Sequence, residues 1–198
     1  MPIAGGAQGE LVAVAARSTN DVWFAGTLDG LRPASLLHWD GTEVRAVPVR
    51  IADPMCTPSR GTVTALTVTG ADVWLGLRCG LTTDAREEGS VQVPPAGYLP
   101  VALAGRARLR EVATLRTDQI LWAVAARGNS VYLVGQQAAN NTPLVLALAG
   151  SGFVPEPVAG DQPLFGVTVD PAGTAWAVGP DFGGSFGPPS AGLWRRTG

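Results

Sequence analysis

The chain has 198 residues, of which 46% are hydrophobic and 15% are charged, and its formal net charge is −2. This composition excludes an intrinsically disordered protein, and the slightly acidic balance lacks the basic surface expected of a nucleic-acid binder. All 14 basic residues are arginine, which excludes Schiff-base catalysis by a lysine.

Glycines (26) and prolines (16) separate short apolar runs along the whole chain, a pattern that predicts an all-β protein. In the first segment, strands are expected at 11–17, 22–26, 35–39 and 44–49. The dipeptide Asp40–Gly41 is a strong hairpin signal between the third and fourth of them. Four short strands joined in this way form a meander, which is the unit of a propeller blade.

Weaker copies of this unit follow. The second has expected strands at 62–68, 72–76, 99–103 and 107–112, with a long insertion from Cys79 to about Gly97. The third repeats the first, because 121–127 matches 11–17 at six of seven positions. Its later strands are expected at 131–135, 144–148 and 153–158, and those of the last unit at 165–170, 174–179 and 193–194.

One aromatic residue recurs at the same place in each unit, at Trp23, Trp74, Tyr132 and Trp176. The intervals between them are 44 to 58 residues, similar to the ~40–50 residues of a propeller blade, so we expect these rings to pack between neighbouring blades. The sequence therefore predicts a single β-propeller domain over 1–198. Its four blade units lie at about 8–50, 60–114, 119–158 and 162–198, and each is a four-stranded antiparallel meander.

The ring either closes within this chain or is part of a larger ring. Residues 2–5 resemble residues 157–160, which end the outer strand of the third unit, whereas the last unit reaches only a third strand. A chain that starts at the end of an outer strand and stops after a third strand slightly favours a partial ring, or a ring completed by another chain. That other chain could be a second copy in a homo-oligomer.

The segments NDVWFAG and LLHWDGT resemble bacterial propeller repeats of the form NDVWAVG…LLHWDGT, which are related to kelch, galactose-oxidase-like and Asp-box propellers. Residues 169–176 also resemble the strand–turn–strand signature of streptogramin-lyase-like and sialidase-like propellers, although the Asp-box spacing is not kept. The resemblance implies a fold and carries no activity with it.

His38 is the only histidine, and the repeat has Ala102 and Ala147 at the same position, so we expect a packed side chain rather than a catalytic base. A histidine-based metal site is excluded by number, and no catalytic residue, metal or cofactor is predicted. Cys56 and Cys79 flank the first two strands of the second unit, where a disulfide or two buried thiols are both compatible with the pattern. A disulfide would indicate an oxidising compartment.

The longest and least repetitive segments, at 27–33, 50–61, 80–96, 136–142 and 180–190, are expected at one end of every blade. Binding residues concentrate on such loops, although these could equally be solvated loop surface. The candidate ligand-binding residues are Asp29, Arg32, Asp84, Arg86, Gln136, Asn140 and Asp181.

The sequence favours a non-enzymatic recognition module for a protein or glycan ligand. A propeller-type lyase or glycosidase, and a structural part of a larger ring, remain as alternatives. We see no signal peptide at the N-terminus and no apolar run of the roughly 20 residues that span a bilayer. An extracellular or periplasmic bacterial location is expected.

Overall fold

The structure is a computed structural model that describes residues 9–28, 35–50, 61–70, 72–79, 99–105, 109–114, 119–181 and 190–196. Within these ranges every helix or strand assigned is a strand, which confirms the predicted all-β class. The strands form four sheets that follow one another along the chain.

The first sheet is an antiparallel meander of β1 (Gly9–Ser18), β2 (Asp21–Leu28), β3 (Ser35–Trp39) and β4 (Val44–Val47). The predicted hairpin between β3 and β4 is confirmed. Gly41 has a φ of 94°, a conformation that glycine adopts without strain. The carboxylate of Asp40 accepts hydrogen bonds from the backbone N–H groups of Thr42 and Glu43 and closes the turn.

The second sheet differs from the predicted four-stranded meander. It contains β6 (Gly61–Val68), β7 (Val73–Cys79), β8 (Leu99–Gly105) and β9 (Leu109–Thr114) in antiparallel order, and also β5 (Val49–Arg50), which runs parallel to β9. The sequence predicted one strand over 44–49. Pro48 has no N–H to donate and separates β4 from β5, so the chain changes sheet there.

The third sheet is a meander of β10 (Gln119–Arg127), β11 (Ser130–Gln137), β12 (Pro143–Ala149) and β13 (Gly152–Pro155). The fourth contains β14 (Gly166–Val169), β15 (Ala175–Asp181) and β16 (Ser190–Arg196), three strands in the part of the chain that is described. Every predicted strand of these two units therefore corresponds to an observed one.

Three apolar clusters hold successive sheets together. The first joins the first two sheets and contains Trp23, the second joins the second and third and contains Trp74, and the last joins the third and fourth and contains Tyr132. Each of these aromatic rings is buried against the following sheet, as the sequence predicted. Trp176 holds the same position in the fourth sheet, after which no further sheet is described.

The pairing register defines the equivalent positions and corrects one of them. Trp23 pairs with His38, Tyr132 with Ala147 and Trp176 with Arg195. The partner of Trp74 is Ala104, whereas the sequence placed Ala102 opposite it. The strand predicted over 99–103 extends to Gly105, which moves the pairing by two residues.

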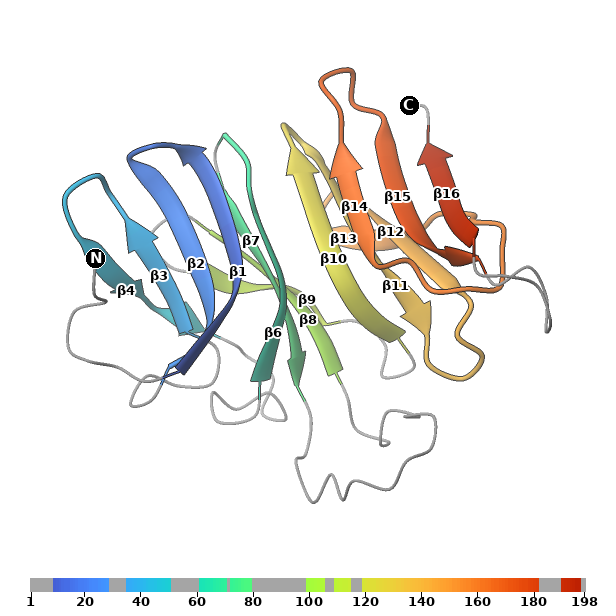
Figure 1. Cartoon of the computed structure of the whole chain (residues 1–198), viewed down its shortest axis with the longest axis horizontal. Coiled ribbons are helices and arrows are strands. Elements are labelled where there is room, and N and C mark those ends of the chain that lie inside the picture. The colour runs from blue at the N-terminus through green and yellow to red at the C-terminus, as the bar shows by residue number, and fades with distance from the viewer. Residues whose placement is uncertain are drawn as a thin grey trace.

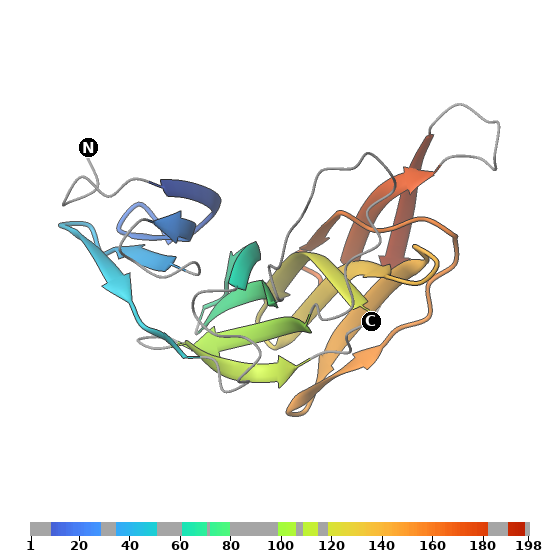
Figure 2. The ribbon, with the colours of Figure 1, turned by 90° about the horizontal axis from the view of Figure 1, so that it is seen from below.

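The four sheets form an open arc. Figure 1 shows them as a series from blue to red, with the first and fourth sheets at opposite ends. Viewed from below in Figure 2, they follow a curve whose two ends do not meet. Neighbouring sheets are in contact mainly through their first strands, β1 with β6, β6 with β10, and β10 with β14. A closed four-bladed ring, one of the two alternatives left by the sequence, is not found among the described strands.

Candidate functional site

The two ends of the strands carry different connections. Because consecutive strands are antiparallel, the tight turns β1–β2, β3–β4, β6–β7, β10–β11 and β12–β13 lie at one end of the sheets, called the hairpin end below. The connections β2–β3, β7–β8, β11–β12 and β15–β16 lie at the other end, called the loop end. Both polar sites described next lie at the hairpin end.

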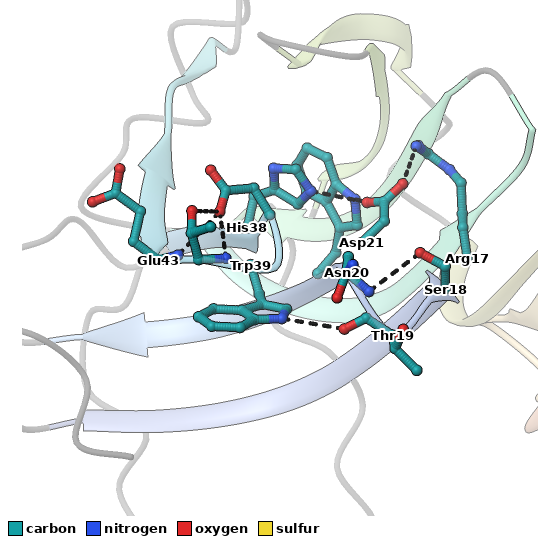
Figure 3. A network of polar contacts seen from close by, with 11 residues as sticks. Arg17, Ser18, Thr19, Asn20, Asp21, His38, Trp39 and Glu43 are labelled. Atoms are coloured by element: carbon teal, nitrogen blue, oxygen red, sulfur yellow. Dashed lines mark hydrogen bonds and ion pairs between the residues drawn. The ribbon is translucent and has the colours of Figure 1, made fainter.

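Asp21, the first residue of β2, is the centre of a polar network in the first sheet (Figure 3). Its Oδ1 accepts a hydrogen bond from Trp23 Nε1 at 2.6 Å and lies 2.9 Å from His38 Nε2. Its Oδ2 accepts a hydrogen bond from Arg17 Nη1 at 2.7 Å. The rings of Trp23 and His38 stack with their centroids 4.1 Å apart.

Strand geometry explains why these groups meet. Residues two apart in a strand share a face, so Asp21 and Trp23 project to the same side of β2. His38 is directly opposite Trp23 in β3 and lies on that face too. The contact between His38 and Asp21 could not be predicted from the sequence, because it depends on the register between two strands that are separated by a loop.

The carboxyl group of Asp21 is charged at neutral pH. Partial burial by itself raises its pKa, but the hydrogen bonds from Trp23 and His38 and the charges of Arg17 and His38 outweigh burial, so the pKa lies below the ordinary 3.8. The network therefore stabilises the folded chain in the form with an ionised Asp21.

A similar hydrogen bond between a tryptophan and a carboxylate is found in the fourth sheet, which has no histidine. In the fourth sheet Asp170 Oδ2 accepts a hydrogen bond from Trp176 Nε1 at 3.2 Å, and this bond lowers the pKa of Asp170. The guanidinium of Arg195, paired with Trp176 as His38 is with Trp23, lies 4.9 Å from the centroid of that ring. No hydroxyl or thiol hydrogen-bonds to His38 within the described residues. We interpret both networks as clamps that orient the repeated tryptophan.

We expect Asp21→Asn to reduce the free energy of unfolding at pH 7 by about 1 kcal/mol, because charge-assisted hydrogen bonds are replaced by neutral ones. A depressed pKa in the folded state means that the carboxylate stabilises the fold above pH 3.8 and that this contribution is lost as the pH falls through the lower folded value. Urea unfolding between pH 7 and pH 2 should show that the free energy of unfolding falls less with acidification in the variant than in the wild type.

The matched control is Asp161→Asn, which changes an exposed aspartate without a hydrogen bond or ion pair to another described residue. The control should keep the acid sensitivity of the wild type. Equal pH profiles for Asp21→Asn and the wild type would contradict the clamp.

A pocket of about 350 Å³ lies between the second and third sheets at the hairpin end. It is lined by Thr69, Asp72, Trp74, Gly128, Asn129, Val131, Leu148 and Gly150. Asp72 precedes Trp74 by two residues, as Asp21 precedes Trp23 in the first sheet. The carboxylate of Asp72, however, has no hydrogen bond or ion pair to another described residue. Trp74 pairs with an alanine rather than a histidine, so the second sheet has no imidazole at this position.

This pocket was not predicted from the sequence, because binding residues were expected at the loop end. The signal was present in the repeat, since an aspartate two residues before the aromatic recurs at Asp21 and Asp72 while the histidine does not recur. A comparison of the first two units shows that the aspartate is kept while its histidine partner is replaced.

Two predicted ligand-binding residues can be placed with their side chains, and both lie at the loop end of the third sheet. Gln136 is buried, its Oε1 accepts a hydrogen bond from Trp122 Nε1 at 3.0 Å, and its Nε2 donates to Asn141 Oδ1 at 2.7 Å. Asn140 Oδ1 accepts hydrogen bonds from the N–H and hydroxyl of Thr142, which form the β11–β12 turn. A binding role for either remains a prediction.

The other predicted residues are placed incompletely. Asp181 ends β15 and pairs with Ser190, but its side chain lies outside the described part of the structure. Asp29, Arg32, Asp84 and Arg86 lie outside the described residues altogether, as does Cys56. Cys79 ends β7, again without a described side chain, so the disulfide also remains a prediction.

No family model matches this chain. No match was found among curated proteins either. Among solved structures, the one titled "YCF48 bound to D1 peptide" is similar, with a TM-score of 0.39 and 9% sequence identity. The alignment covers 87% of this chain and 63% of that one, so the chain spans less than two thirds of the length of this structure. A similarity of this extent does not identify a function.

The described residues contain no group of three or more His, Cys, Asp or Glu side chains that could hold a metal ion. They also contain no helix with the length and hydrophobicity needed to cross a membrane.

Proposed function

We propose that this chain is a non-enzymatic recognition module of the β-propeller type, and that it binds a glycan in the pocket between its second and third sheets. The observation that carries the proposal is the lining of that pocket. It combines an indole, a carboxylate without a partner among the described residues and an exposed amide in one hollow of about 350 Å³. Ligand pockets typically have volumes of about 300–1,000 Å³.

The chemistry of the lining suits a sugar. A sugar ring has apolar C–H faces and a rim of hydroxyl groups, so it needs both apolar contact and hydrogen-bonding partners. Trp74 and Val131 line the pocket, but both are buried and offer only a small apolar area to it. The Asp72 carboxylate can accept hydrogen bonds from hydroxyl groups, and the Asn129 amide can both donate and accept them. A glycan is therefore better matched than an apolar ligand.

The same lining favours binding over hydrolysis. Glycosidases place two carboxyl groups about 5–10 Å apart across the scissile bond. Asp72 is the one ionisable residue among the described residues that line this pocket. The Asp21–His38 pair belongs to the first sheet and already binds Trp23 and Arg17. This arrangement supports a protein that holds its ligand without cleaving it. We propose an extracellular or periplasmic location for it, as expected from the sequence.

A glycan array followed by calorimetric titration with the best-bound oligosaccharide tests the proposal. Asp72→Asn and Asn129→Ala should each weaken binding about 5- to 30-fold, the effect of losing about 1–2 kcal/mol of hydrogen bonding. The matched control is Asn20→Ala, which changes the asparagine of the corresponding turn in the first sheet and should leave the affinity unchanged.

Three other outcomes would contradict the proposed glycan pocket, each in a different way. Binding that survives both pocket variants would place the ligand at the loop end, as the sequence predicted. Binding to peptides and not to glycans would favour the protein-ligand alternative. Release of a shorter saccharide during the titration would show an enzyme.

A further inference from the structure

Each inner sheet of the arc has two covered faces. The leading face is the one turned toward the preceding sheet, and the trailing face is turned toward the following one. In the third sheet, Leu121 and Leu133 lie in the cluster shared with the second sheet, whereas Tyr132 and Val134 lie in the cluster shared with the fourth. The repeat therefore identifies which residues a neighbouring sheet is built to cover.

The leading face of the first sheet is exposed along β1, although Leu37 of β3, on the same face, is buried. Ala13 packs into the cluster shared with the second sheet, so Val14 points to the opposite face. Val14 is 64% exposed, whereas Val124, its equivalent in the matching segment of the third sheet, is 8% exposed beneath the second sheet. Leu11 and Val12 of the same strand are also exposed. The first sheet thus presents an apolar surface of the kind that is buried in the third.

The trailing face of the fourth sheet is exposed as well. Val178 stands two residues after Trp176, as Val134 does after Tyr132, and is 49% exposed where Val134 is fully buried at 0%. Leu193 pairs with Val178, as Val145 pairs with Val134, and is 65% exposed where Val145 is 1% exposed. Residues that occupy core positions in the third sheet therefore lie at the surface in the fourth.

The exposed leading face of the first sheet and the exposed trailing face of the fourth sheet are the two types of face that pack together elsewhere in the chain. Within the chain, a trailing face always packs on the leading face of the next sheet, and this contact is made three times. The free faces are one leading and one trailing face, and the chain itself does not bring them together because its first and fourth sheets lie at opposite ends (Figure 1). The contact that would bury both is the contact already made between every pair of neighbouring sheets.

We propose that the exposed faces bind a second copy of this chain, with the fourth sheet of each copy packed on the first sheet of the other. Two such contacts close a ring. One copy contributes four sheets and two contribute eight, which is the upper limit of the ~4–8 blades found in propellers. A third copy would exceed that limit, so the ring has two copies. The ring has two-fold symmetry, so its two contacts are equivalent, and each joins the fourth sheet of one copy to the first sheet of the other. This inference does not rest on the proposed glycan pocket.

Native mass spectrometry and light scattering of the purified chain at micromolar concentration test the ring. The wild type should have twice the 20.3 kDa mass of one chain. Val14→Glu and Leu193→Glu should each give a monomer, because each places a charge in both contacts of the ring. Both residues are exposed in the single chain, so the variants should fold. The matched control is Val154→Glu, an exposed valine of the third sheet, which should remain a dimer.

Mixing the two monomeric variants separates this geometry from others. The fourth sheet of the Val14→Glu chain and the first sheet of the Leu193→Glu chain both keep their native faces, so the mixture should form a heterodimer through one contact. Far-UV circular dichroism and the milder variants Val14→Ser and Leu193→Ser check that loss of the dimer is not loss of the fold. A monomeric wild type, larger mixed assemblies, or a mixture that stays monomeric would each overturn the proposal.

Discussion

Gly135→Ala is expected to reduce the free energy of unfolding by roughly 3 kcal/mol or more. A methyl group on Gly135 would lie 1.8 Å from the carbonyl oxygen of Ile120 in the neighbouring strand. That atom belongs to the backbone of β10, so relief of the clash requires the β10–β11 pairing to shift. The same restriction applies to Gly26 and Gly179, where the added carbon would lie 2.0 Å from a backbone oxygen.

Urea unfolding monitored by far-UV circular dichroism measures this effect. Gly152→Ala is the matched control, because a methyl group there meets no atom within 4 Å and the glycine does not have a positive φ. The control should change the free energy of unfolding by less than about 0.5 kcal/mol. A Gly135→Ala protein as stable as the control would show that β10 can move away at little cost.

These glycines also show why the strands were predictable from the sequence. An aromatic followed three residues later by a glycine recurs at Trp23–Gly26, Tyr132–Gly135 and Trp176–Gly179. The aromatic packs between sheets or at an end face, and the glycine lies where the backbone of the preceding segment approaches too closely for a side chain. Both requirements are local to one hairpin, so they leave a repeating pattern in the sequence.

The features that the sequence missed depend on contacts between distant segments. The Asp21–His38 contact requires the register between β2 and β3. The residue of β8 that pairs with Trp74 was misplaced by two positions, because the sequence did not show where β8 ends. The parallel pairing of β5 with β9 joins two units and follows no local period. Such contacts depend on the arrangement of several strands at once.

The candidate site was predicted from polarity and loop length, and neither determines burial. Gln136 was chosen as a polar residue beside a variable segment, yet its amide is hydrogen-bonded to Trp122 and Asn141 inside the third sheet. Asp72 was not a candidate because the candidates were taken from the long loops, yet it lines the pocket. Polar residues in a repeat protein are better judged by comparing equivalent positions, where a change of partner indicates a change of role.

The second large effect is expected for Leu133→Ala, at about 2–5 kcal/mol of the free energy of unfolding. Leu133 is fully buried in the cluster between the second and third sheets, beside Trp74, Leu121 and Leu146. Removing its side chain loses apolar contact and leaves a cavity that packed strands on both sides can fill only in part. Val154→Ala, an exposed change on β13, should alter the free energy of unfolding by less than about 0.5 kcal/mol.

The position of Leu133 gives this variant a second readout. In an array where each sheet contacts only its neighbours, stability is approximately a sum of sheet and interface terms, and the interface between the second and third sheets links the two halves of the arc. Weakening it should separate the unfolding of the halves. In the Leu193→Glu background, exchange of backbone amides in β2 and β15 should then respond differently to urea. Coincident responses in the two strands, with a loss below about 1 kcal/mol, would show that this cluster does not couple the sheets.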